Sequence, residues 1–172
     1  SFVYREISPY VILLSGGQGG VPDLFGWKNR KDKPGLVLKF DLVAFDEVAG
    51  SNFKTESDKQ MYKGYMEQGS FFFFFDKGTL SADAGIVFNG NLDGDVETTA
   101  RISHLFNALP ETIRNDLAFH DRWHAYLPGW ELPKMQPDYF TYHMGFIADY
   151  LAEIFHTELR RRNYTDAYDR LF

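Results

Sequence analysis

The chain lacks cysteine altogether among its 172 residues, which excludes a disulfide framework and a thiolate metal or redox site. It also lacks an excess of positive charge, because 24 acids outnumber 18 lysines and arginines and leave a net charge of −6. Nothing in that balance indicates a general affinity for nucleic acid or for a membrane surface. We find no signal peptide and no apolar run long enough to span a bilayer, so we expect a cytoplasmic protein with no membrane partner.

What the sequence does contain is one stretch, residues 40–50, on which the functional prediction depends. A short run rich in Val, Leu and Phe ends there in Asp46 and Glu47, a pattern typical of a buried parallel strand. Ligands of α/β folds bind at the carboxyl ends of such strands. Nucleoside triphosphatases use two polar groups in such a site, one that holds Mg²⁺ and one that positions the attacking water. The alternative is a strand whose solvated end carries two acids by chance, and these two residues alone leave it open.

Other short apolar runs indicate further strands. Residues 11–14 and 84–88 predict two buried strands, and the second is followed by Asn89 and Asn91. Five consecutive phenylalanines, residues 71–75, precede a turn and a possible return strand, which predicts a hairpin. Polar residues therefore follow two of the predicted strands, acids after one and asparagines after the other.

Apolar residues at helical spacing alternate with these strands, as in an α/β fold. The predicted helices cover residues 57–68, 97–109, 111–118 and 139–162. We expect Ser57 and Asp58 to cap the first helix and Gly69 to end it, and we expect the last to be one long amphipathic helix. The length fits one domain, which we divide into an α/β core over 1–135 and a C-terminal helical segment over 136–172.

Three other features are weaker signals. The glycine-rich loop at 15–20 lacks the spacing and the lysine of a P-loop, so we interpret it as a flexible connection. The basic run at 28–35 is interpreted as a solvated surface loop that could touch phosphates. His120 and His124 could share a helix face as zinc ligands would, but no third ligand is evident, and we interpret them as structural histidines.

Several stretches together resemble the AAA+ ATPase region of the Lon-related BREX phage-defence proteins, the BrxL family. They are Leu-Leu-Ser-Gly-Gly-Gln, Val-Ala-Phe-Asp-Glu-Val-Ala-Gly, Gly-Asn, Ser-His-Leu-Phe and, most specific, Asp-Arg-Trp-His-Ala-Tyr-Leu-Pro-Gly-Trp-Glu. The resemblance covers the chain from about Phe2 to about Phe155. It implies a partial AAA+ P-loop NTPase core, with a parallel sheet flanked by helices and the P-loop truncated at the N-terminus.

The resemblance also implies roles for particular residues. Asp46 matches the acid that holds Mg²⁺, and Glu47 matches the residue that polarises the hydrolytic water. Asn91 matches the sensor residue near the γ-phosphate, with Asn89 as the second choice. Arg122 matches an arginine finger that reaches the ATP of a neighbouring subunit, and its alternative is a salt bridge to Asp121 or another nearby acid.

Two departures from the family pattern affect these implications. The P-loop Gly-Lys is missing, so Ser1 is expected to be the P-loop serine and a Mg²⁺ ligand, and this fragment alone is expected to be inactive. The phenylalanine run at 71–75 stands where the family usually has Arg-Gly after an aromatic residue. Loops in that region of AAA+ rings face the pore, so the run either lines a pore or is simply a buried strand.

Three functions follow from these expectations. The first is an ATP-hydrolysing homo-oligomeric ring motor that acts on DNA in phage defence, with ATP and Mg²⁺ as cofactors. The second is the ATPase module of a Lon-type protease, in which the phenylalanine run grips a polypeptide substrate. The third is a non-catalytic AAA+-fold interaction domain.

Overall fold

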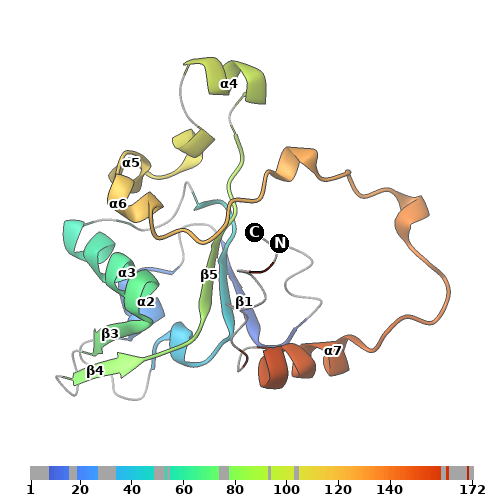
Figure 1. Cartoon of the computed structure of the whole chain (residues 1–172), viewed down its shortest axis with the longest axis horizontal. Coiled ribbons are helices and arrows are strands. Elements are labelled where there is room, and N and C mark those ends of the chain that lie inside the picture. The colour runs from blue at the N-terminus through green and yellow to red at the C-terminus, as the bar shows by residue number, and fades with distance from the viewer. Residues whose placement is uncertain are drawn as a thin grey trace.

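A three-stranded parallel sheet forms the centre of the molecule (Figure 1). The computed structural model describes residues 8–15, 19–26, 34–48, 53, 55–73, 78–92, 94–102, 105–159, 162 and 170. The sheet consists of β1 (Val11–Leu14), β2 (Leu42–Phe45) and β5 (Gly85–Phe88), in the order β1-β2-β5. The predicted α/β fold with a parallel sheet flanked by helices is therefore confirmed.

The register of the sheet brings the three strand ends level with one another. Leu14 lies beside Phe45, and Phe45 lies beside Phe88, at the last position of each strand. Because parallel strands run in the same direction, the residues that follow these three positions share one edge of the sheet. The acids after β2 and the asparagines after β5 are brought to this carboxyl edge.

The longest helix in the described part of the chain is α3 (Glu56–Gln68), and its two ends show how local sequence sets its limits. The Thr55 side chain accepts a hydrogen bond from the Asp58 N–H, and the Asp58 carboxylate accepts one from the Thr55 N–H, both at 3.1 Å. This reciprocal pair satisfies two backbone donors that the first turn leaves free. Asp58 therefore takes part in the cap as predicted, but the N-cap residue is Thr55 rather than Ser57. Gly69 ends the helix as predicted, in the left-handed conformation with φ 62°.

The phenylalanine run begins an antiparallel hairpin, as predicted. Strand β3 (Ser70–Phe73) pairs with β4 (Gly78–Ser81). Neighbouring side chains of a strand point to opposite faces, and accordingly Phe71 is buried at 4% exposure while Phe72 is 48% exposed. The start of the run thus contributes one phenylalanine to the core and one to the surface, and positions 74 and 75 lie outside the described residues.

The predicted helix over 97–109 was wrong as a single element. It is α4 (Val96–Ile102) followed by a separate 3₁₀ turn, Leu105–Ala108. The predicted helix over 111–118 likewise divides into α5 (Glu111–Arg114) and α6 (Leu117–His120). Asp116 causes the second division, because its side chain caps α6 by accepting the Phe119 N–H at 3.0 Å.

The predicted long helix over 139–162 was also wrong. Only α7 (Ala148–Ile154) is α-helical there, and it continues into a π-helical turn, Phe155–Leu159. The residues before α7 form two 3₁₀ turns, Gly129–Glu131 and Pro137–Tyr139, joined by non-helical chain. We call residues 126–147 the arm.

The core lies on one face of the sheet. Helices α2 (Val21–Phe25) and α3 pack there beside the hairpin, whereas the arm leaves the body and returns on the other side (Figure 1). Phe45 and Tyr62 meet with ring centroids 6.4 Å apart, and Phe25 and Tyr62 meet at 5.5 Å. Aromatic burial of this kind dominates the apolar area that a small domain removes from water.

Helix α7 is held at the amino end of the sheet, opposite the carboxyl edge. The His156 ring stacks on Tyr10 with centroids 4.1 Å apart, and its Nδ1 lies 2.5 Å from the Asp41 carboxylate. The Tyr10 hydroxyl donates to Glu153 at 2.9 Å.

Within the part of the chain that the structure describes, we find no helix with the length and apolar character that crossing a membrane requires.

Candidate active site

Asp46 is positioned by the end of β2. The residues just before it, 43–45, are buried, and its own N–H donates to the Leu14 carbonyl at 2.7 Å. That bond extends the pairing of β1 and β2 by one residue, so the backbone of Asp46 is fixed while its side chain is only half-buried. The carboxylate is thus held at the carboxyl edge and remains accessible to a ligand.

Glu47 has an unusual backbone. Its φ is 58°, and it is the only non-glycine residue with a positive φ among those the structure describes. A side chain in this left-handed region costs about 1–2 kcal/mol, and such strain is concentrated at functional sites. The turn is held in place by Val48, whose N–H donates to the Asn89 carbonyl at 2.8 Å. The Glu47 side chain is exposed, and it extends from a rigid turn at the edge of the sheet.

Asn89 is the residue from β5 that lies beside this turn. Its N–H donates to the Phe45 carbonyl at 2.8 Å, which places it directly across from the end of β2. Its side-chain Nδ2 is buried and has no hydrogen-bond partner among the described residues. Asn91 lies two positions further along and is exposed. The family pattern predicts the sensor role for Asn91, and this stays a prediction. The position of Asn89 immediately after the strand is the sequence signal for Asn89.

The glycine-rich loop returns to the same edge of the sheet. Gly19 has φ 87°, and a Cβ added there would lie 2.5 Å from Leu14 Cδ1 and 2.9 Å from Phe45 Cε1. Only glycine fits this close approach to the last residues of β1 and β2. The Tyr62 hydroxyl donates to the Gly19 carbonyl at 3.2 Å, so the end of the loop is fixed to the core, a contact that sequence analysis did not predict.

Arg122 lies just after α6 and makes contacts within its own chain. One guanidinium nitrogen donates to the Ala118 carbonyl, and Nη2 pairs with Glu67 Oε2 at 2.5 Å near the end of α3. The next residue, Trp123, stacks on Phe88 with ring centroids 6.1 Å apart, so this turn packs against the last residue of β5. The pairing is an intrachain salt bridge of the kind we kept as the alternative, to Glu67 rather than Asp121, and the finger role stays a prediction.

The donor set at this edge fits a magnesium–nucleotide complex. Mg²⁺ is usually held by one or two carboxylates together with substrate phosphates and water, and Asp46 supplies such a carboxylate. The unpaired Nδ2 of Asn89 beside it is a hydrogen-bond donor suited to a phosphate oxygen or a water. No cluster of three or more His, Asp or Glu ligands occurs within the described ranges. Ser1, the predicted second Mg²⁺ ligand, lies outside them.

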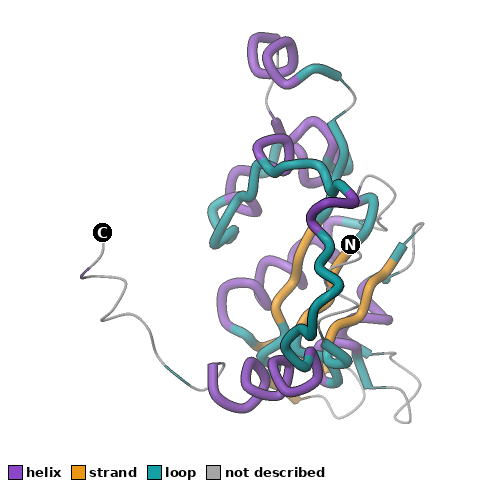
Figure 2. The backbone as a smooth tube through the Cα atoms, turned by 90° about the vertical axis from the view of Figure 1, so that its right-hand side faces the viewer, coloured by secondary structure: helices purple, strands orange, loops and turns teal. Residues whose placement is uncertain are grey.

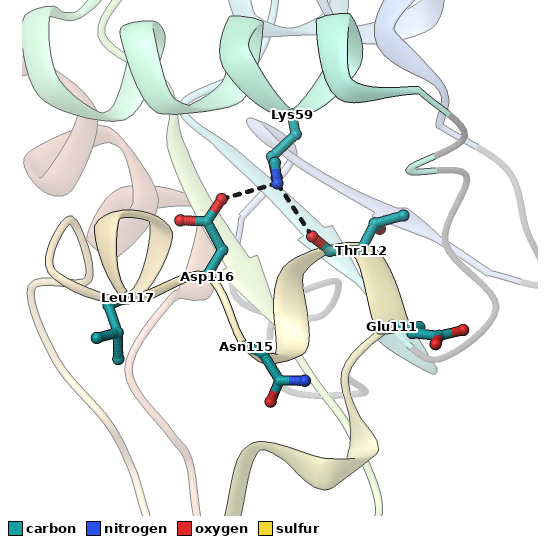
Figure 3. A pocket seen from close by; sticks show the side chains of 6 residues that line it. All are labelled: Lys59, Glu111, Thr112, Asn115, Asp116 and Leu117. Carbon is teal, nitrogen blue, oxygen red and sulfur yellow. Dashed lines mark hydrogen bonds and ion pairs between the residues drawn. The ribbon is translucent and has the colours of Figure 1, made fainter.

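A separate pocket, of about 510 Å³, lies between α3 and the α5–α6 turn (Figure 3). Lys59 lies in this pocket and neutralises the charge of Asp116. The Lys59 Nζ lies 2.9 Å from the Asp116 carboxylate and donates a hydrogen bond to the Thr112 carbonyl at 3.3 Å. The hydrogen bond from Lys59 holds the pKa of Asp116 well below its usual range. Because these charges already satisfy one another, we assign this pocket to the packing of α3 against α5 and α6.

A buried parallel strand ends here in two acids, beside an asparagine whose side-chain donor has no partner in the described part of the chain. This defines an α/β domain with an acidic site at the carboxyl edge. That is the arrangement found in nucleoside triphosphatases. A model of the family "Lon-like protease BrxL-like, ATPase domain" matches residues 1–172, and the chain belongs to this family.

Two relatives agree with this assignment. The Lon-like protease BrxL of Bacillus cereus (strain H3081.97) is 49% identical over 172 residues, which are 100% of this chain and 25% of that protein. The Lon-like protease BrxL of Escherichia coli O9:H4 (strain HS) is 46% identical over the same length, 100% of this chain and 24% of that protein. The chain thus spans about a quarter of the length of these relatives.

Proposed function

We propose that the protein containing this chain hydrolyses ATP at the carboxyl edge of the sheet. The observation that carries the proposal is the turn at Asp46 and Glu47, fixed to both neighbouring strands and strained at Glu47. A fold that only needed a solvated strand end would not require a non-glycine residue in the left-handed region there. Membership of an ATPase-domain family supports the same conclusion.

The residues of the edge have distinct roles in this proposal. Asp46, together with Ser1, would hold Mg²⁺, which when bound with ATP neutralises charge on the phosphates. Glu47 accepts a hydrogen bond from the attacking water and orients it toward the γ-phosphate. Asn91 or Asn89 donates to the γ-phosphate or to that water. Arg122 of a neighbouring subunit stabilises the charge that develops on the transferred group, an effect worth about 10³–10⁵ in rate in other enzymes.

We further propose that ATP turnover drives a homo-oligomeric ring along DNA in phage defence. The support is the resemblance to the Lon-related BREX proteins and the two BrxL relatives. The arginine-finger role would require such an assembly, because a finger supplied in trans acts on the nucleotide of a neighbouring subunit. Within its own chain Arg122 pairs with Glu67.

A second candidate is a motor that acts on polypeptides. The half-exposed Phe72 on the hairpin favours it, because an exposed aromatic side chain can grip an unfolded peptide as well as stack on a base. The third candidate, a domain that keeps the fold without hydrolysis, requires the acidic edge to have no catalytic use.

The test is the ATPase rate of the full-length protein, measured with and without duplex DNA. The matched control is Glu47→Gln, which keeps the size of the side chain and removes the carboxylate. We expect hydrolysis that DNA stimulates, and a loss of about 100-fold or more in Glu47→Gln. Hydrolysis that DNA does not change would favour the polypeptide motor. A wild-type rate equal to that of Glu47→Gln, at concentrations where rings form, would contradict both motor functions.

A further inference from the structure

The arm, residues 126–147, exposes an unusual amount of apolar surface. Every residue from 129 to 150 is exposed, and Tyr142 and Met144 are completely so, at 101% and 104%. Eleven large hydrophobic side chains of the arm are exposed, and they are Tyr126, Leu127, Trp130, Leu132, Met135, Tyr139, Phe140, Tyr142, Met144, Phe146 and Ile147. The arm stands away from the sheet between its attachments in Figure 1, and it passes in front of the sheet when the molecule is viewed from that side in Figure 2.

The two attachments of the arm belong to the same folded body. At its beginning Tyr126 packs edge-on against Phe106, with ring centroids 5.7 Å apart. At its end Phe146 contacts Tyr150 of α7, at 5.9 Å, and α7 is held at the amino end of the sheet by His156 and Asp41. The arm is therefore a loop fixed at both ends rather than a tail, and its apolar middle is presented outward.

The area involved exceeds what a monomer normally leaves in water. Six of the eleven side chains are aromatic, and an aromatic side chain carries roughly 150–250 Å² of surface. Because these six and the five smaller Leu, Met and Ile side chains are between 42% and 104% exposed, together they present on the order of 1,000 Å². The largest apolar patch on a typical monomer is about 300–600 Å². A stable protein–protein interface buries about 800 Å² on each partner. The arm alone is thus large enough for such an interface.

The composition of the arm indicates which partner it suits. Its charged residues are only Glu131, Lys134 and Asp138, so it cannot supply the cations that a nucleic-acid backbone requires. Its enrichment in Tyr, Phe, Trp and Met and its depletion in charge match the core of an interface between permanently associated copies. Large, predominantly apolar interfaces are typical of obligate homo-oligomers rather than of transient complexes.

We propose that the arm packs against a second copy of this chain and is the subunit contact of the assembly. The proposal takes from the proposed function only the idea of a ring, to which it assigns a contact surface. Its evidence is the exposed apolar surface of the arm. The neighbouring subunit covers Tyr142 and Met144 and removes the apolar middle of the arm from water.

Cross-linking in the full-length protein tests this directly. Two copies with different affinity tags are expressed together, and only one carries a photoreactive benzoylphenylalanine in place of Tyr142. We expect irradiation to join the two tags covalently, so that both are recovered together after denaturation. A cross-link that stays within the copy carrying the probe would show that another part of the same polypeptide covers the arm, and would overturn the proposal. Irradiation without any cross-link would overturn it as well.

A variant provides the second measurement. The double substitution Tyr142→Ser with Met144→Ser removes the two most exposed apolar side chains and leaves no cavity in the subunit itself. We expect the dissociation constant of the assembly, measured by sedimentation, to rise at least about tenfold. Ile102→Ser, at a position that is 80% exposed on α4, is the matched control and is expected to sediment as wild type. Equal assembly of the double variant and wild type would contradict the proposal.

ATPase measurements on the same samples separate this proposal from the catalytic one. If wild type hydrolyses no more ATP than Glu47→Gln but still cross-links between copies, the ATPase proposal fails and the arm contact stands. If wild type hydrolyses ATP while its copies do not cross-link, the arm contact fails and the acidic edge stands.

Discussion

The two ends of the parallel sheet differ in whether their polar groups are paired. At the carboxyl edge the Glu47 backbone is strained, and the Nδ2 of Asn89 is buried without a partner among the described residues. At the amino end the polar groups are paired, Asp41 with His156 at 2.5 Å and Tyr10 with Glu153 at 2.9 Å. Both ends are built on the same strands, so the difference does not come from the sheet itself.

The difference indicates what each end is for. A buried polar group without a partner costs about 1–3 kcal/mol, and a left-handed side chain costs a similar amount. A fold keeps both costs at one edge when a ligand satisfies the groups. The paired groups at the other end instead fix α7, and through it the returning end of the arm, to the core. These differences support the proposal that catalysis takes place at the carboxyl edge, whereas the amino end attaches the C-terminal elements.

The largest expected effect comes from replacing the aspartate at one end of β2 and comparing it with the same replacement at the other end. Asp46 follows this strand and Asp41 precedes it, so Asp46→Asn and Asp41→Asn make the same chemical change at opposite edges. We expect Asp46→Asn to lower the ATPase rate of the full-length protein about 100-fold or more, because the carboxylate proposed to hold Mg²⁺ is lost. Asp41→Asn should leave the rate within about twofold of wild type, because Asp41 lies at the opposite edge.

Asp41→Asn should act on stability instead. Loss of its pairing with His156 is expected to cost about 1 kcal/mol, and α7 amides should then exchange with solvent about fivefold faster. Hydrogen exchange followed by mass spectrometry measures this, and Asp46→Asn is its control, with α7 exchange as in wild type. A loss of ATPase activity in Asp41→Asn comparable to that in Asp46→Asn would remove the distinction between the two ends.

The carboxyl edge was largely predictable, because its residues are contiguous with the strands that position them. Asp46 and Glu47 follow an apolar run whose pattern indicates a buried strand. Because they directly follow that strand in sequence, they must lie at its carboxyl end. The backbone strain at Glu47 and the contact between Val48 and Asn89 were not predictable, because they depend on the register between strands distant in sequence. The approach of Gly19 to Leu14 depends on tertiary packing in the same way.

The C-terminal region shows the limit of periodicity. Apolar residues recur at helical spacing from Phe140 to Leu159, yet only Ala148–Ile154 is α-helical. A helix gains most of its stability by packing its apolar face, and Ala152 is the buried residue of α7. The apolar side chains before α7 are exposed, because the described part of the chain does not bury them. The sequence pattern shows which positions are apolar, but it does not show whether another surface is present for them to pack against.

The strain at Glu47 gives a second, smaller prediction. Glu47→Gly removes a left-handed side chain that costs about 1–2 kcal/mol, offset by about 0.5–1 kcal/mol of glycine entropy. We expect unfolding to require about 0.5–1 kcal/mol more than in wild type, measured by denaturant unfolding of the domain. Glu47→Ala keeps the strain and is the matched control without this gain. Both variants should lose ATPase activity. A Glu47→Gly variant less stable than Glu47→Ala would show that the turn is not strained.

The smallest effect is expected at the paired end, from Tyr10→Phe. The hydrogen bond to Glu153 and the charge of that carboxylate raise the pKa of Tyr10 above its ordinary value. A raised pKa in the folded state means that the contribution to stability is complete below the unfolded pKa, near 10. It is lost as the pH rises through the folded pKa. The stability difference between wild type and Tyr10→Phe should therefore be constant from pH 7 to 9 and shrink above about pH 10.

Denaturant midpoints of both proteins across that range measure this difference, and Tyr150→Phe is the control, because Tyr150 lies outside the arm and is 60% exposed. Its hydroxyl is expected to make no difference at any pH. A Tyr10→Phe protein with the same pH profile as wild type would mean that Glu153 does not hold Tyr10 in solution. The amino end would then attach α7 through the contacts of His156 with Asp41 and with the ring at position 10, and the contrast between the two ends of the sheet would rest on these contacts.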